Sequence, residues 1–166
     1  MRMCVFPIIM IALAAPAHAG PIELAPGLWQ IESEETQDVA NDGRLDPNPP
    51  VTSSELRCLD EESAWLVPSD YADSFTSRGC QQENLLSTPL DFEGVWSCRV
   101  DGLDLTINMS GEANLTGDAY ATLMTVTGRN TEKSVNMKNS VTAKRMGECP
   151  VTGEYIPPNE AGFQIY

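Results

Sequence analysis

Apolar and polar residues alternate through most of the second half of the chain, and this pattern predicts β-strands. Within residues 103–109 every second residue is apolar, as in a strand that buries one face. Turn residues separate this run from its neighbours, so we expect five consecutive antiparallel strands. The expected strands are residues 95–100, 103–109, 112–116, 119–127 and 134–145. The Asp101-Gly102 pair predicts a two-residue hairpin turn between the first two.

The first half of the chain shows the pattern less clearly. We expect strands at residues 28–36, 51–58 and 80–87, the first with Trp29 and Ile31 on its buried face. Residues 37–50 are polar and carry Gly43 and three prolines, which predicts a flexible loop. After Cys58, Asp60 is placed to cap a short helix that would end before Pro68. Residues 69–77 either add a further turn of helix or remain irregular. The fold class that follows is mainly β: an antiparallel meander that forms a curved sheet or a small barrel-like domain, with one short helical segment.

The first 19 residues have the pattern of a signal peptide. A basic start around Arg2 precedes an apolar stretch, and Ala17-His18-Ala19 has the small-x-small form of a cleavage site. We therefore expect export, cleavage before Gly20, and a periplasmic or secreted product with no stable membrane insertion. The mature chain would hold a single β-rich domain at residues 20–150 and a C-terminal tail at residues 151–166.

The charge of the chain excludes some partners. It has 166 residues with 24 acidic and 10 basic side chains, a net charge of −14 at pH 7. A protein this acidic repels phosphate backbones, so nucleic acid is not an expected partner.

Histidine and cysteine usage limits the chemistry further. Beyond the predicted signal peptide the chain has no histidine, which excludes His-based catalytic triads and His-containing zinc sites from the mature protein. Its four cysteines contain no C-x₂-C pair of the kind that zinc sites use, so we expect two disulfides in an oxidising compartment. The cysteines are Cys58, Cys80, Cys98 and Cys149.

Several short motifs occur in one order along the chain. They are Pro26-Gly27-Leu28-Trp29, Cys58-Leu59, Cys80, Trp96-x-Cys98 and Arg145-Met146-Gly147-x-Cys149. This series resembles a bacterial family of exported proteins known only as a domain of unknown function, with the pattern PGLW…CL…C…C…RxGxC. The resemblance covers about residues 26–149 and implies an envelope location, a mostly β fold and two disulfides. It implies no activity, cofactor or catalytic residue.

Four cysteines allow three pairings, and the sequence alone does not choose among them. We favour Cys58–Cys80 with Cys98–Cys149, because the second bond would join the two ends of the meander and protect its edges.

Three classes of function remain: a non-enzymatic binding or interaction module of the cell envelope, a small barrel-like carrier of an apolar ligand, and a hydrolase that uses two carboxylates. No spacing of residues selects a catalytic pair or a metal site, so the first class is favoured and no catalytic residue, cofactor or metal ligand is assigned. The expected partner is an unknown envelope protein or a small apolar ligand that is neutral or cationic. Inward-facing residues that would line such a site, or simply fill the core, are Leu103, Leu105, Ile107, Met109, Tyr120, Met124 and Met137.

Overall fold

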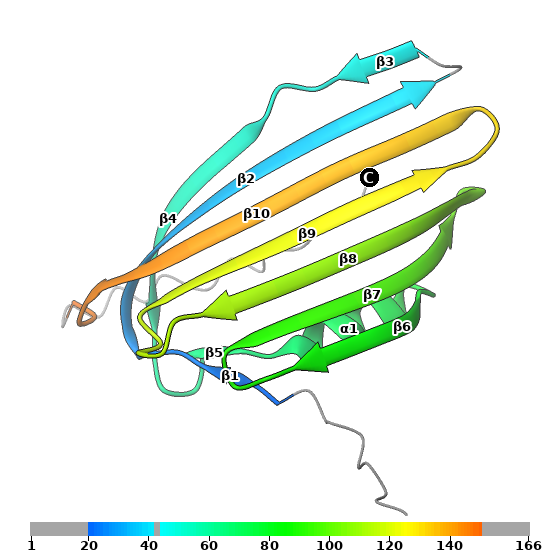
Figure 1. The fold of residues 1–166 in the computed structure, drawn as a ribbon. Helices are drawn as coiled ribbons and strands as arrows, with labels where there is room; N and C mark the ends of the chain where they lie inside the picture. The colour runs from blue at the N-terminus through cyan, green and yellow to red at the C-terminus, as the bar shows by residue number, and fades with distance from the viewer. Residues whose placement is uncertain (1–19, 42–43, 151–166) are drawn as a thin grey trace, which may run out of the picture.

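The computed structural model describes residues 20–41 and 44–150, and the fold is mainly β with one helix (Figure 1). The predicted signal peptide and C-terminal tail lie outside the described residues. The main sheet has eight strands: β2 (Gly27–Asn41), β3 (Arg44–Pro47), β4 (Val51–Leu59), β6 (Gln81–Ser87), β7 (Asp91–Val100), β8 (Leu103–Ala113), β9 (Ala119–Arg129) and β10 (Lys133–Gly147). A small second sheet pairs β1 (Ile22–Glu23) with β5 (Trp65–Leu66), and the helix is α1 (Pro68–Ser77).

The main sheet is antiparallel and open. Its strand order is β3-β2-β10-β9-β8-β7-β6, and β4 also pairs with β2, along the half of β2 that β3 leaves free. The edge strands are therefore β6 on one side and β3 with β4 on the other. The predicted β class, antiparallel arrangement and short helix are confirmed, and of the two predicted architectures the sheet is the open one.

The hairpin at Asp101-Gly102 is confirmed. Val100 pairs with Leu103 across it, and both turn residues have positive φ, 50° for Asp101 and 78° for Gly102. These values match a two-residue type I′ turn, whose twist suits the flanking strands.

The separate strand predicted at residues 112–116 is wrong. Glu112 and Ala113 finish β8, and the chain then turns at Asn114. The Asn114 side-chain oxygen accepts hydrogen bonds from the backbone N–H groups of Asp118 and Ala119, at 3.0 and 3.2 Å. This asparagine turn leads directly into β9, so the meander has four long strands instead of five.

The helix lies one segment later than predicted. Asp60 does accept backbone hydrogen bonds, from Glu62 at 3.2 Å and Ser63 at 2.9 Å, but these close an isolated turn. The helix begins at Pro68 and runs to Ser77. Proline fits in the first turn of a helix, where its missing N–H has no helical partner to lose, so Pro68 starts the helix that we expected it to end.

Most of the loop predicted at residues 37–50 is strand. β2 continues to Asn41, where it pairs with Lys133 of β10, and β3 covers residues 44–47. The backbone of β2 thus has a partner strand on both sides at residues 38–41. This pairing makes the segment a strand although its residues show no alternation of apolar and polar side chains.

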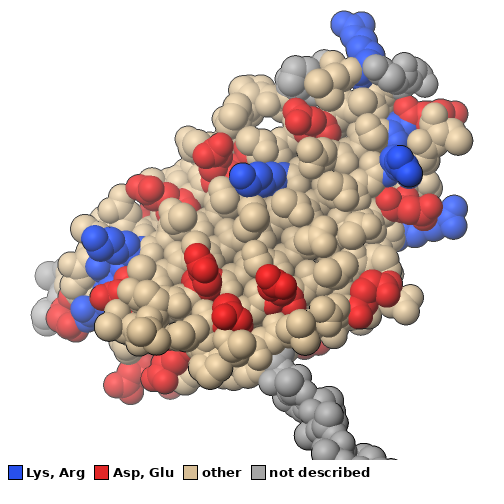
Figure 2. All heavy atoms as spheres, in the orientation of Figure 1, with Lys and Arg blue, Asp and Glu red and all other residues tan. Residues whose placement is uncertain are grey.

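The two faces of the sheet differ in what covers them. α1 packs on one face, which we call the helix face, and lies behind the sheet in Figure 1. The rings of Phe75 and Trp96 are 4.9 Å apart, and those of Tyr71 and Phe92 are 5.9 Å apart and stacked. The buried core lies on this face, and Trp96 is fully buried. We call the other side, which faces the viewer in Figures 1 and 2, the open face.

Both disulfides form, but the favoured pairing is wrong. The bonds are Cys58–Cys149 and Cys80–Cys98. Joining Cys98 to Cys149 would have required β7 and β10 to meet, yet β8 and β9 lie between them in the open sheet. Cys80 instead precedes β6, the partner of β7, and Cys58 lies on β4, next to the β2 strand that also pairs with β10.

A candidate ligand-binding cleft

A cleft of about 280 Å³ opens on the helix face, between α1 and the part of the sheet that α1 leaves uncovered. Its walls come from β8, β9, β10, β2, β4 and the helix residue Tyr71. Four apolar residues form its inner surface: Ile31, Met109, Met124 and Val141. Met109 and Met124 are only 4% exposed, so the base of the cleft is continuous with the core.

The register of the strands explains how these residues meet. Met109 pairs with Met124, and Met124 with Asn139, which gives one row across three strands. In the next row on the same face, Thr122 pairs with Val141, and Val141 pairs with Ser33. The cleft therefore has an apolar base with hydroxyl and amide groups between the methionine and valine side chains.

An ion pair closes the cleft on the side of β4. Arg57 and Glu55 lie two residues apart on this edge strand, so both side chains point to the helix face. The Arg57 Nη2 atom donates a hydrogen bond to Glu55 Oε1 at 2.5 Å. The two side chains are 25% and 41% exposed, so the pair lies at the rim, where the guanidinium and the carboxylate largely neutralise each other.

Two tyrosines, Tyr71 and Tyr120, also line the cleft. The pKa of Tyr120 is raised to about 12, mainly by burial; the nearby Tyr71 phenol acts in the same direction and Arg57 in the opposite one. Burial, with a smaller contribution from Asp70, also raises the pKa of Tyr71. Both phenols are therefore protonated at neutral pH. Neither hydroxyl forms a hydrogen bond with another described residue, so both O–H groups can donate to a ligand or water.

The residues predicted to face a ligand divide into two groups. Met109, Tyr120 and Met124 line the cleft. The other four lie on the same face outside it. Ile107 is part of the buried core, Leu105 and Met137 pack against that core, and Leu103 begins β8 beside the hairpin turn.

Sequence reasoning missed Tyr71, Glu55 and Arg57. Tyr71 lies in residues 69–77, for which the sequence left a turn of helix and irregular structure open, and the two charged residues occupy inward positions of an edge strand. A residue on the covered face that is not apolar does not stand out in the alternation of apolar and polar residues. These three residues can therefore be identified only from how α1 and β4 pack against the sheet.

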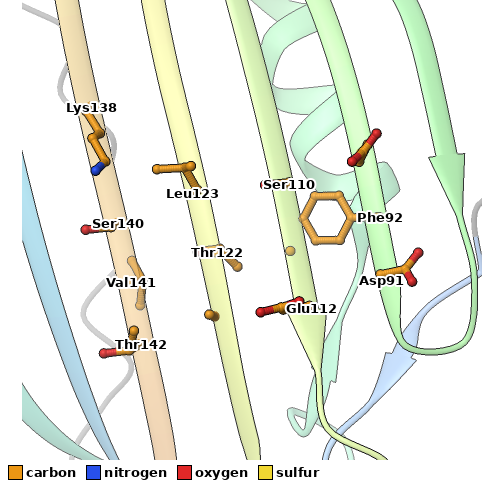
Figure 3. Close-up of a pocket in the computed structure, with 13 residues that line it drawn as sticks. Asp91, Phe92, Ser110, Glu112, Thr122, Leu123, Lys138, Ser140, Val141 and Thr142 are labelled. Atoms are coloured by element: carbon orange, nitrogen blue, oxygen red, sulfur yellow. The ribbon is translucent and has the colours of Figure 1, made fainter.

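A larger hollow of about 610 Å³ lies on the open face (Figure 3). Asp91 and Glu112 are directly opposite each other on β7 and β8, while Lys138 and Ser140 line it from β10. Figure 2 shows acidic side chains scattered over this face with fewer basic ones. The hollow lies on the side of the sheet that α1 leaves bare. Within residues 20–41 and 44–150, no group of three His, Cys, Asp or Glu residues is arranged to hold a metal ion.

A family model described as "Protein of unknown function (DUF3617)" matches residues 24–149. This confirms the expected membership in a family of unknown function. No curated protein and no solved structure shows significant similarity to the chain.

Proposed function

The chain belongs to the DUF3617 family of proteins of unknown function, and we propose that it is an exported, non-enzymatic binding module that takes a small, largely apolar molecule into the helix-face cleft. The observation that carries this proposal is the cleft itself. It combines a buried apolar base with a few convergent polar groups, which is the usual composition of small-molecule sites.

The groups around the cleft favour binding over catalysis. A hydrolase of the carboxylate type needs two carboxyl groups on either side of the reacting bond, and among the described residues Glu55 is the one carboxylate that lines this cleft. Arg57 holds it in an ion pair, and the two phenols stay neutral. These groups are suited to orient a bound molecule.

Export to the periplasm or beyond is part of the proposal. The two disulfides support it, because such bonds persist in oxidising compartments. No helix of the described part of the chain is long and apolar enough to cross a membrane.

A fluorescent neutral probe of suitable size, 2-naphthol, tests the binding role. We expect saturable binding to the folded protein. Thr122→Phe, in the middle of the cleft, should weaken binding at least tenfold, because the added ring fills the space. The neighbouring change Leu123→Phe is the matched control, since Leu123 lies on the open face and is 37% exposed. It should leave binding unchanged.

Two outcomes would overturn the proposal. One is binding of the probe only after unfolding, and the other is equal binding by both variants. In either case recognition of a partner protein, the interaction-module alternative, becomes the better hypothesis. Circular dichroism of each variant checks that it is folded before binding is compared.

A further inference from the structure

We propose that the cleft selects a small, neutral aromatic molecule that carries a hydrogen-bond acceptor. This inference rests on the proposed binding function and goes further by naming the class of ligand. Four properties of the cleft lead to it: its size, the balance of charge at its rim, its hydrogen-bond donors, and the methionine and tyrosine side chains that surround it.

The size limits the ligand to a few rings at most. A buried apolar cavity of about 150 Å³ holds one benzene molecule. The cleft, at about 280 Å³, has room for a benzene-sized ring and a substituent, and its open side admits somewhat more. A long acyl chain or a full lipid would leave most of its apolar surface in water.

The charge at the rim favours a neutral molecule. Glu55 and Arg57 already form an ion pair. An anionic ligand would add a second carboxylate beside the one guanidinium, and a cationic ligand would place a second positive charge beside Arg57. Either ligand would have to share Arg57 or Glu55 with the existing ion pair, and it would also lose its own hydration. Binding of an anion and binding of a cation are therefore both disfavoured.

The polar groups of the cleft select for an acceptor. Tyr71 and Tyr120 each present a neutral O–H group, and burial keeps the proton on each oxygen. Arg57 uses its Nη2 atom on Glu55 and has further N–H groups. A ligand carbonyl, ether or hydroxyl oxygen satisfies these donors, whereas a hydrocarbon would bury them without partners.

The surrounding side chains favour an aromatic ring. Met109 and Met124 place two thioethers at the base of the cleft, and sulfur makes favourable contacts with ring edges. The Tyr71 and Tyr120 rings offer stacking or edge contacts. Tyr120 is itself held by Trp29, whose ring centroid lies 5.6 Å away and which is fully buried. This contact restricts the orientation of the Tyr120 ring before a ligand enters.

Four probes of nearly equal shape test the inference by NMR chemical-shift titration of the folded protein. Acetophenone is neutral and has an acceptor, ethylbenzene lacks the acceptor, benzoate is anionic and benzylamine is cationic. We expect acetophenone to bind about tenfold more tightly than each of the others, with shifts confined to residues around the cleft.

Removing the donors provides a second readout. Tyr71→Phe and Tyr120→Phe keep the rings and delete only the hydroxyl groups. Loss of one hydrogen bond of about 0.5–1.5 kcal/mol corresponds to a drop of about two- to tenfold in acetophenone affinity. Ethylbenzene affinity should stay the same or rise in both variants, because this probe never used the hydroxyl groups.

The outcomes separate this inference from the binding function. If 2-naphthol binds in the cleft but the four probes bind equally, or benzoate or benzylamine binds best, the ligand class is wrong and the binding function stands. Unchanged acetophenone affinity in both tyrosine variants would also overturn the class. If 2-naphthol binding is insensitive to Thr122→Phe, the binding function itself fails.

Discussion

The Arg145 side chain reaches across to the start of the domain, where its Nε atom donates a hydrogen bond to the Pro26 carbonyl at 2.6 Å. Arg145 also pairs with Glu148, and the disulfide from Cys58 to Cys149 lies just beyond. The end of β10 is thus fastened to the entry of β2. The sequence motifs around Pro26-Gly27 and Arg145-x-Gly147 therefore meet in space and form a structural clasp.

The clasp predicts a severe effect of Gly27→Ala. Gly27 has φ of 145°, and an added Cβ would lie 2.3 Å from the Gly147 oxygen and 2.5 Å from Arg145 Nε. We expect a loss of about 3 kcal/mol or more in unfolding free energy, measured by urea denaturation. Gly147→Ala is the matched control, because Gly147 has φ of 150° but open space at its Cβ position. Equal losses in the two variants would show that the backbone angle, and not the close contact, constrains Gly27.

The two disulfides should contribute unequally to stability. Cys58 and Cys149 are 91 positions apart, and Cys80 and Cys98 are 18 apart. In the chain-entropy model these loops correspond to about 4.6 and about 3.2 kcal/mol. Replacing Cys58 and Cys149 by Ala should therefore lower the unfolding free energy more than replacing Cys80 and Cys98. Because Cys80 and Cys98 are the more buried pair, the packing lost on replacing them is subtracted before the two losses are compared. A non-reduced peptide map that links Cys58 to Cys80 would contradict the structure itself.

The parts of the fold that could be read from sequence are those in which one face is buried. Around Ile107 the alternation is strict because every second side chain meets the core, and a slip of one residue would expose the whole set. The hairpin at Asp101-Gly102 was equally readable, since few residue pairs tolerate two positive φ angles.

Elements that depend on distant partners were not readable. The end of β2 near Asn41 is a strand because β10 pairs with it from more than 90 residues away, while its own residues show no alternation of apolar and polar side chains. The disulfide prediction failed for a related reason. The prediction assumed that the meander closes on itself, but the sheet is open. β2 and β6, which flank the meander of β7 to β10, therefore decide which cysteines are neighbours.

The candidate site was readable only where its residues continue the buried face of a strand. Met109, Tyr120 and Met124 were identified from strand periodicity, because they belong to the core or pack against it. Arg57 and Tyr71 reach the cleft through an edge strand and through a helix that starts at a proline. Neither position follows from local pattern, since both depend on how β4 and α1 pack against the sheet.

The phase of β8 can be tested by placing a charge on each face in turn. Ile107 is 2% exposed on the helix face, and Thr106 is exposed on the open face. Ile107→Asp should lower the unfolding free energy by about 3–5 kcal/mol or prevent folding, because it buries an unpaired carboxylate. Thr106→Asp should cost less than about 1 kcal/mol. Similar shifts in melting temperature for the two variants would mean that the assigned faces are wrong.

Stability should fall in alkaline solution because of Tyr120. Its pKa in the folded protein is raised by burial to about 12, from an ordinary value of 10.0. The unfolded chain then loses the phenol proton more readily than the folded one, so this contribution to stability is complete below pH 10 and is lost as the pH rises toward 12. We expect the unfolding free energy of the wild-type protein to decline over this range, and Tyr120→Phe to make the decline shallower. Comparing the two proteins at each pH removes the effect of the lysines and the other tyrosines, which they share. If both lose stability in parallel between pH 10 and 12, the phenol of Tyr120 ionises as readily in the folded protein as in the unfolded chain, and the cleft is wetter than its packing implies.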